Sequence, residues 1–400
     1  MRRVLAALLC LPALCGAATV QDWPLPAPPA SAQPNLAQAP NGDLLLSWIE
    51  RKGDHHRLMF SRYPPREPTW SPPQVIAQGK DWFVNWADFP ALQALPDGSL
   101  WAHLLVKNGD APYAYDVQLH ASRDGGRSWQ LADPVHTDGT PTEHGFASLW
   151  PRSGAELGIV WLDGRNTRGG HDHASHGGGG MSLRAAVFDA RGRRRDEREL
   201  DPMTCDCCQT DAAVGAKGVL VAYRDRDPGE VRDIKLTRFD GTAWTAPASV
   251  HADGWVMPAC PVNGPAIAAR GDQAWVAWYT EAGGAPSLRL ARSVDAGAHF
   301  SAPKIVSSGA AQLGRVDLAA DAGGVWVSWL QEAQGQQSLW LAKFSPDLAS
   351  ERFRVRVADV AGRGRATGFP RLQVRGGTAW LAWTEVRDGQ PRLRGARILP

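Results

Sequence analysis

A long internal repeat constrains the fold of this 400-residue chain more than any other feature of the sequence. Each copy has an apolar stretch, a turn and a strand of alternating bulky residues, as in "NLAQAPNGDLLLSWIE" and "PAIAARGDQAWVAWYTEA". The equivalent bulky residues of the seven copies are Trp48, Leu104, Trp161, Tyr223, Trp278, Trp329 and Trp383. They are spaced 51 to 62 residues apart, which is room for four ordinary strands and their turns. This spacing predicts an all-β propeller with one blade per copy.

The two ends of the repeat region look like complementary parts of one blade. "QDWPLPAP" near the N-terminus resembles a fourth strand without the first three, and "RLRGARILP" at the C-terminus resembles a third strand without its fourth. Pairing these two strands would remove two open sheet edges. We therefore expect seven four-stranded blades closed by the N- and C-terminal strands, with a six-bladed ring as the alternative. The 42 Gly and 30 Pro suit the many turns of such a fold.

The first 18 residues predict a secretory signal peptide, followed by a single propeller domain over residues 19–400. Two arginines precede an apolar run and then small residues near Ala17, which is the order found in exported proteins. The apolar run is too short to span a bilayer. A net charge of +2 with interspersed signs gives no footprint for nucleic acid or an anionic membrane. We expect a periplasmic or secreted monomer.

Two turn motifs suggest a family. "SRDGGRSW" fits the pattern Ser-x-Asp-x-Gly-x-x-Trp, and "SVDAGAHF" fits it with phenylalanine as the aromatic residue. The motif residues are Ser122, Asp124, Gly126, Trp129, Ser293, Asp295, Gly297 and Phe300. This pattern resembles the Asp-box, or BNR repeat, of the sialidase superfamily of propellers. The polar oxygens can bond the turn backbone and glycine can adopt positive φ, so the motif itself is expected to be structural.

The resemblance implies a glycan-acting protein, either an exo-sialidase-like glycoside hydrolase or a lectin. Sialidases carry an Arg-Ile-Pro motif whose arginine grips the substrate carboxylate. The corresponding block here is "DFPALQALPDGSL", so Asp88 stands where that arginine would be. Arg315 in "GRVDLAA" has a similar setting in a later blade. The nearest tyrosine–glutamate pair in sequence, Tyr279 and Glu281, follows the ordinary blade pattern.

Several polar residues fall near the starts of the innermost strands and form a candidate pocket. They are Asp88, Asp211 and Arg315, as candidates for acid–base catalysis on a small molecule or glycan, and His144, Asn263 and Asp317, as candidate substrate contacts. The alternative is that these side chains only hold waters in the central channel.

A second candidate site lies in the loops of the middle blades, where soft ligands gather. Cys205 and Cys260 each fall 18 residues before the bulky residue of their blade, so they should meet on one rim. The candidate metal or disulfide residues are Cys205, Cys207, Cys208, Cys260, Met203, Met257, His171, His173 and His176. Thiolate, thioether and imidazole together favour copper. In an exported protein, structural disulfides and a redox-active Cys207–Cys208 pair are the alternatives.

Overall fold

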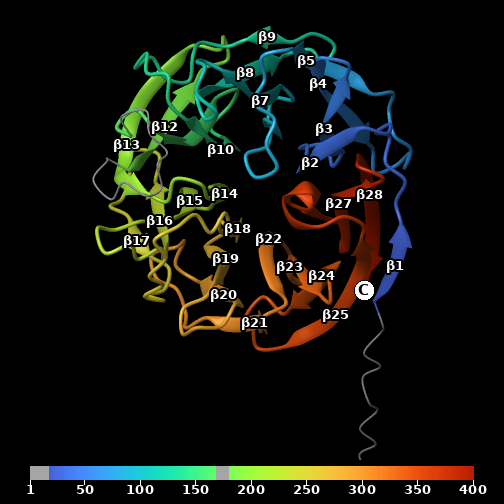
Figure 1. The fold of residues 1–400 in the computed structure, drawn as a ribbon, viewed down its shortest axis with the longest axis vertical. Coiled ribbons are helices and arrows are strands. Elements are labelled where there is room, and N and C mark those ends of the chain that lie inside the picture. The colour runs from blue at the N-terminus through green and yellow to red at the C-terminus, as the bar shows by residue number, and fades with distance from the viewer. Residues whose placement is uncertain (1–17, 168–179) are drawn as a thin grey trace, which may run out of the picture.

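Seven sheets of four antiparallel strands surround a central axis, so the protein is a seven-bladed β-propeller (Figure 1). The structure is a computed structural model and describes residues 18–167 and 180–400. The predicted fold class and blade number are confirmed, and the six-bladed alternative is wrong. In the described residues the one helical element is a short 3-10 turn, η1 (Gly364–Thr367), and none has the length and apolarity of a membrane-spanning helix.

The first three blades follow one another along the chain. Blade 1 consists of β2 (Ser31–Gln38), β3 (Leu44–Lys52), β4 (His55–Tyr63) and β5 (Gln74–Gly79). Blade 2 consists of β6 (Ala91–Ala94), β7 (Leu100–Lys107), β8 (Tyr115–Ser122) and β9 (Gln130–Leu131). Blade 3 consists of β10 (His144–Pro151), β11 (Leu157–Asp163), β12 (Met181–Phe188) and β13 (Arg194–Thr204).

The remaining blades continue in the same order. Blade 4 consists of β14 (Asp211–Gly215), β15 (Gly218–Arg224), β16 (Ile234–Phe239) and β17 (Ala248–Ser249). Blade 5 consists of β18 (Ala266–Arg270), β19 (Gln273–Thr280), β20 (Ser287–Ser293) and β21 (Lys304–Ser308). Blade 6 consists of β22 (Gln312–Asp321), β23 (Gly324–Ala333), β24 (Gln336–Phe344) and β25 (Glu351–Val360). Blade 7 consists of β26 (Arg371–Arg375), β27 (Thr378–Arg387), β28 (Gln390–Leu399) and β1 (Thr19–Asp22).

The ring is closed by the two ends of the described chain, as the sequence predicted. Strand β1 pairs antiparallel with β28, from Thr19 opposite Leu399 to Asp22 opposite Ala396. The chain then continues into Trp23, whose ring is 3% exposed and stacks on Trp70 of blade 1. The closing strand therefore fills the last sheet and is held to the next blade by aromatic packing.

The bulky residues of the repeat all lie on the second strand of their blade and are buried. Their exposed fractions run from 0% at Trp48 to 3% at Trp383. Alternation along a strand sends successive side chains to opposite faces, and each face is covered by the neighbouring blade. The apolar core is consequently a series of clusters between adjacent blades rather than one central mass.

The two Asp-box-like turns are held by the contacts expected of their residues. The Ser122 hydroxyl oxygen accepts a hydrogen bond from the Gly126 N–H at 2.8 Å, and Asp124 accepts from the Ser128 N–H at 2.9 Å. In the second turn the Ser293 hydroxyl accepts from the Gly297 N–H at 2.9 Å. Gly126 has φ +94°, and a Cβ there would lie 2.2 Å from the Phe60 ring of blade 1. These side-chain hydrogen bonds lie within each turn, and glycine is required where the first turn packs on the neighbouring blade 1.

Candidate functional site

The loops that lead into the first strands of the blades lie at one end of the ring, which we call the top end. In antiparallel blades the start of each first strand and the end of each second strand lie at the same end. There the loops leading into blades 2 to 5 enclose a cavity of about 120 Å³, here called the top pocket. Its lining includes Trp86, Asp88, Tyr115, Glu143, Cys207, Cys260 and Arg365. Acidic, aromatic and thiol side chains thus share one small space.

A buried tyrosine between two carboxyl groups forms the floor of the top pocket. The Tyr115 hydroxyl oxygen lies 2.8 Å from Oδ2 of Asp88 and 2.5 Å from Oε1 of Glu143. Exposed fractions are 2% for Asp88, 0% for Tyr115 and 5% for Glu143. The Phe83 ring stacks on Tyr115 at 4.0 Å between centroids, with planes 10° apart. The tyrosine is therefore fixed between its two acidic partners.

The Tyr115 hydroxyl has one proton and can donate it to only one of the two carboxylates. A hydrogen bond to the other carboxyl group therefore requires a second proton on that group. Burial raises the pKa of Asp88 to about 7, although the Phe146 N–H and Tyr115 partly oppose that rise. Burial and the nearby charges of Asp88 and Glu143 raise the pKa of Tyr115 well above its usual value. Near neutral pH, Asp88 can hold the extra proton and donate it towards Tyr115, while Tyr115 donates to Glu143. Such an arrangement can deliver or accept a proton in the pocket.

Arg315 is buried and binds the backbone of the η1 turn. Its guanidinium donates to the carbonyl oxygens of Gly364 at 2.8 Å and Gly368 at 2.9 Å, which flank and form η1. It also lies 4.8 Å from the centroid of the Trp86 ring, and burial lowers its pKa to about 10. Arg315 thus holds the turn that carries Arg365 into the top pocket. Asp88 is in the lining of the top pocket, whereas Arg315, predicted beside it as a catalytic residue, is not.

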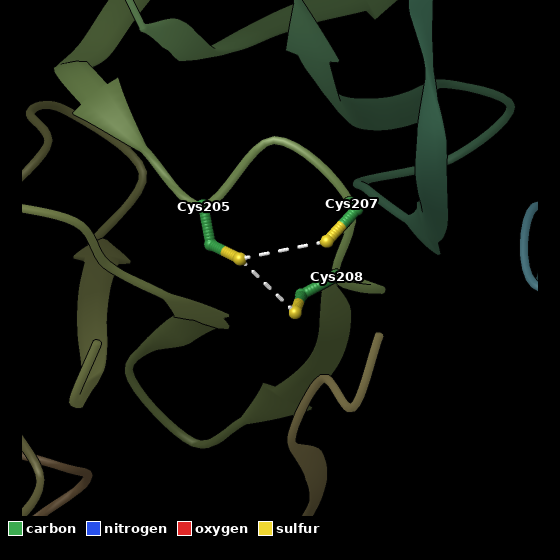
Figure 2. Close-up of side chains that lie close together, drawn as sticks. All are labelled: Cys205, Cys207 and Cys208. Atoms are coloured by element: carbon green, nitrogen blue, oxygen red, sulfur yellow. Dashed lines mark hydrogen bonds between the residues drawn. The ribbon is translucent and has the colours of Figure 1, made fainter. Parts of the chain in front are cut away.

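Three cysteines of the fourth blade's entry loop lie close together (Figure 2), and Cys207 is the one that lines the top pocket. The Cys205 sulfur lies 3.1 Å from that of Cys208 and 3.9 Å from that of Cys207. Cys207 in turn interacts with Cys260, and both line the pocket. The predicted meeting of the two loops is therefore observed. Within the described residues, none of these four cysteines is joined in a disulfide bond.

Cys205 is the most acidic thiol of this cluster. Burial alone would raise its pKa, but the thiols of Cys207 and Cys208 and the guanidinium of Arg232 lower that pKa well below the usual value. The Arg232 Nη1 lies 3.2 Å from the sulfur. Burial raises the pKa of Cys207 and of Cys208 well above normal. The cluster therefore favours one thiolate held by two thiols and an arginine.

The methionines predicted as ligands lie elsewhere. The Met203 side chain faces Gly180, and Met257 packs against the core between blades 5 and 6. His171, His173 and His176 lie outside the described residues. The soft-ligand set that the structure brings together is thus made of cysteines.

Asp211 and Asp317 line the central channel rather than the top pocket. They lie on the first strands of blades 4 and 6 and line a cavity of about 600 Å³. Asp211 accepts a hydrogen bond from the Ile267 N–H of blade 5 at 2.8 Å, and Asp317 accepts from the Leu372 N–H of blade 7 at 2.7 Å. Asn35 does the same for blade 2 at 3.1 Å. These side chains join consecutive blades.

The sequence analysis predicted Asn263 and His144 as substrate contacts. In the structure both contact other residues of the protein and neither lines the top pocket. The Asn263 side-chain oxygen accepts from the Arg315 N–H at 2.7 Å, which links blade 5 to blade 6. His144 is fully buried at the start of β10, beside a second histidine and three aspartates.

Comparison with known proteins supports the fold class. The sequence matches no protein-family model and no curated protein. Among solved structures, the polysaccharide lyase Uly1 is similar over 92% of this chain and 90% of its own, with 10% identity and a TM-score of 0.51. The GH93 α-L-arabinofuranosidase of Fusarium graminearum covers 92% of this chain and 93% of its own, with 12% identity and a TM-score of 0.48. At such identities the likeness shows a shared fold alone.

Sequence reasoning missed Tyr115, Glu143 and Arg365. Tyr115 reads as the first residue of an ordinary third strand, and Glu143 immediately precedes the predicted His144. One available signal was that Asp88, Glu143 and Cys205 all belong to loops leading into first strands, which converge at the top end. Tyr115 carries no such signal, because its role depends on the side of β8 that faces Asp88.

Proposed function

We propose that this protein is an exported, glycan-acting propeller enzyme that uses the top pocket for acid–base cleavage of a glycosidic linkage. The observation that carries the proposal is the buried hydrogen-bonded chain of Asp88, Tyr115 and Glu143 at the pocket floor. A carboxyl group that keeps its proton near neutral pH suits the role of general acid. The shared fold with Uly1, a polysaccharide lyase, adds support for a glycan substrate.

Each pocket residue has a definable task in this proposal. Asp88 donates a proton to the leaving oxygen, and the Tyr115–Glu143 pair accepts the compensating proton or activates the attacking group. Trp86 offers an apolar face to a sugar ring. The Arg365 guanidinium lies 5.9 Å from the centroid of the Trp86 ring and can contact an anionic substituent of the sugar. A sialoside is one substrate in this class, because the sequence resembles the sialidase superfamily.

The test is a glycan panel assayed for new reducing ends and for unsaturated products. The panel should include a fluorogenic sialoside, neutral arabinans and sulfated or uronate polysaccharides. With a cleaved substrate in hand, Asp88→Asn, Tyr115→Phe and Glu143→Gln are each expected to lower kcat/KM by about 100-fold or more. Secretion is checked by fractionation, which should show loss of a segment ending near Ala17 or Ala18.

Tyr279→Phe is the matched control, because Tyr279 also hydrogen-bonds a glutamate, Glu281, but does not line the top pocket. It should leave kcat/KM unchanged. A substrate that the Asp88→Asn and Glu143→Gln variants cleave at the parental rate would remove the pocket from the reaction.

The cysteine cluster favours a second candidate function, copper binding or thiol redox chemistry. The observation is that Cys205 lies close to two other sulfurs and to Arg232, and that Cys207 meets Cys260 across a loop boundary. Cysteine sulfurs are soft ligands that suit Cu(I).

Copper content and free thiols of the mature protein test this second function. Stoichiometric copper that is lost in both Cys205→Ser and Cys260→Ser would support a metal site, and His299→Ala, at an exposed histidine, should retain it. Protein with no copper and no titratable thiol would indicate structural disulfides instead.

A further inference from the structure

A second cluster of ligand-type side chains lies between blades 2 and 3, separate from the cysteines. It comprises Asp116 on β8, His144 at the start of β10, Asp163 at the end of β11, and His136 and Asp138 on the loop before β10. The side chains of His144 and Asp163 are 0% exposed, and those of His136 and Asp138 are 6% and 9% exposed. The Asp116 side chain is 39% exposed and faces solvent.

The two imidazoles are stacked and present one nitrogen each to the same carboxylate. Their ring centroids lie 3.6 Å apart with planes 14° apart. Nε2 of His136 is 3.1 Å and Nδ1 of His144 is 3.2 Å from Oδ1 of Asp116. At the opposite edges of the rings, Nδ1 of His136 is 2.7 Å and Nε2 of His144 is 3.3 Å from Oδ2 of Asp138.

The two imidazoles differ in how their nitrogens are satisfied. Nδ1 of His136 pairs with Oδ2 of Asp138 at 2.7 Å, so Asp138 can accept the single N–H of a neutral ring and leave a lone pair on the Nε2 that faces Asp116. Neither nitrogen of the buried His144 has a hydrogen-bond partner of acceptable geometry, although Nδ1 lies 3.2 Å from Asp116 and Nε2 lies 3.3 Å from Asp138. A cation bound among Oδ1 of Asp116, Nε2 of His136 and Nδ1 of His144 would give this unsatisfied ring a partner.

The local charge points to a divalent ion. Asp116, Asp138 and Asp163 contribute three negative charges, and Arg165, 2.7 Å from Asp163, contributes one positive charge. With neutral imidazoles, these groups sum to −2 (three negative minus one positive). Imidazole nitrogens with one carboxylate suit zinc and related transition metals. Carboxylates behind the imidazoles are the usual partners of such ligands, because they fix the tautomer and the ring orientation.

We propose that Asp116, His136 and His144 bind a divalent transition-metal ion of the zinc type, with Asp138 and Asp163 orienting the two imidazoles. The solvent-facing side at Asp116 leaves room for a water ligand. Because Asp116 follows Tyr115 and His144 follows Glu143, the ion would also fix the relative position of β8 and the loop before β10. Metal binding here is independent of the proposed catalytic function and is tested without an activity assay.

Co²⁺ is a suitable probe because its visible spectrum distinguishes nitrogen and oxygen ligands from thiolate ligands. The measurement uses tag-free, chelator-treated protein in which His171, His173 and His176 are replaced by alanine, to remove adventitious loop binding. We expect one equivalent of Co²⁺ without thiolate charge-transfer bands, displaced by one equivalent of Zn²⁺. Asp116→Asn and His136→Gln should weaken binding by about 100-fold or more, and Asp138→Asn by about 10–100-fold.

The Cys205→Ser, Cys260→Ser double variant is the matched control and should retain the Co²⁺ spectrum and affinity. Circular dichroism and metal-free thermal unfolding of Asp116→Asn should match those of the parent, which shows that lost binding is not lost folding. Absence of stoichiometric binding, or binding that Asp116→Asn and His136→Gln leave unchanged, would overturn the proposal.

Discussion

Replacing Arg224 with leucine is expected to lower the free energy of unfolding by about 3–5 kcal/mol, since the change leaves buried polar groups without partners. Arg224 ends β15 and is 1% exposed. Its guanidinium donates hydrogen bonds to the carbonyl oxygens of Asn263 at 2.9 Å, Arg232 at 2.6 Å and Tyr279 at 2.6 Å. These carbonyls belong to blades 4 and 5 and to the loop between them. Urea unfolding of the two proteins measures the difference.

Arg292→Leu is the control for this substitution. Arg292 is half-buried and donates to the Gln273 side chain at 2.9 Å, so its loss should cost about 1 kcal/mol or less. A comparable cost for the two leucine variants would show that the three carbonyls find other partners and that Arg224 does not join the blades.

Asp88→Asn is expected to become more stable relative to the parent as pH rises from about 4 to about 7. Burial raises the folded-state pKa of Asp88 from 3.8 to about 7. Between these values the folded parent binds a proton that the unfolded chain has released, so the parent loses stability as pH rises. Asparagine has no proton to lose. The relative gain should reach about 3–4 kcal/mol and stay constant above pH 7, as measured by urea unfolding across this range.

Asp124→Asn should show the opposite sign, which makes it a useful comparison. Hydrogen bonds from Ser128 lower the pKa of Asp124 in the folded protein. Ionised Asp124 therefore stabilises the fold once the pH exceeds the pKa of this group in the unfolded chain. The asparagine variant should therefore lose relative stability as pH rises through the acidic range. A flat difference between Asp88→Asn and the parent would mean that Asp88 ionises as it does in an unfolded chain, and would also weaken its assignment as general acid.

The sequence was sufficient for the fold because the propeller signal is repeated and local. Each bulky anchor, from Trp48 to Trp383, marks a second strand, and seven copies average out the irregularity of any one. Ring closure could also be predicted from the sequence. A single fourth-strand segment stands at the N-terminal end and the last blade lacks a fourth strand, so pairing the two completes that blade.

The site was predicted in part. Equal spacing before the anchors placed Cys205 and Cys260 on adjacent blades, and their loops do meet at the top pocket. Asp88 was grouped with Asp211 and Asp317 near the starts of the first strands, but it lies 16 residues before its anchor Leu104, whereas the other two lie 12 before theirs. All three accept a backbone N–H of the next blade, and Asp88, which precedes β6, also reaches Tyr115.

The sequence by itself determined the ring, its closure and the meeting of the Cys205 and Cys260 loops, because β periodicity and repeat length are encoded residue by residue. Only the tertiary structure decided that Tyr115 is hydrogen-bonded to Asp88 and Glu143, and that His136 and His144 stack on each other beside Asp116. Those residues come from different blades and loops. The distances between these side chains depend on how far each loop folds over the ring. The spacing of residues along the sequence does not determine that loop conformation.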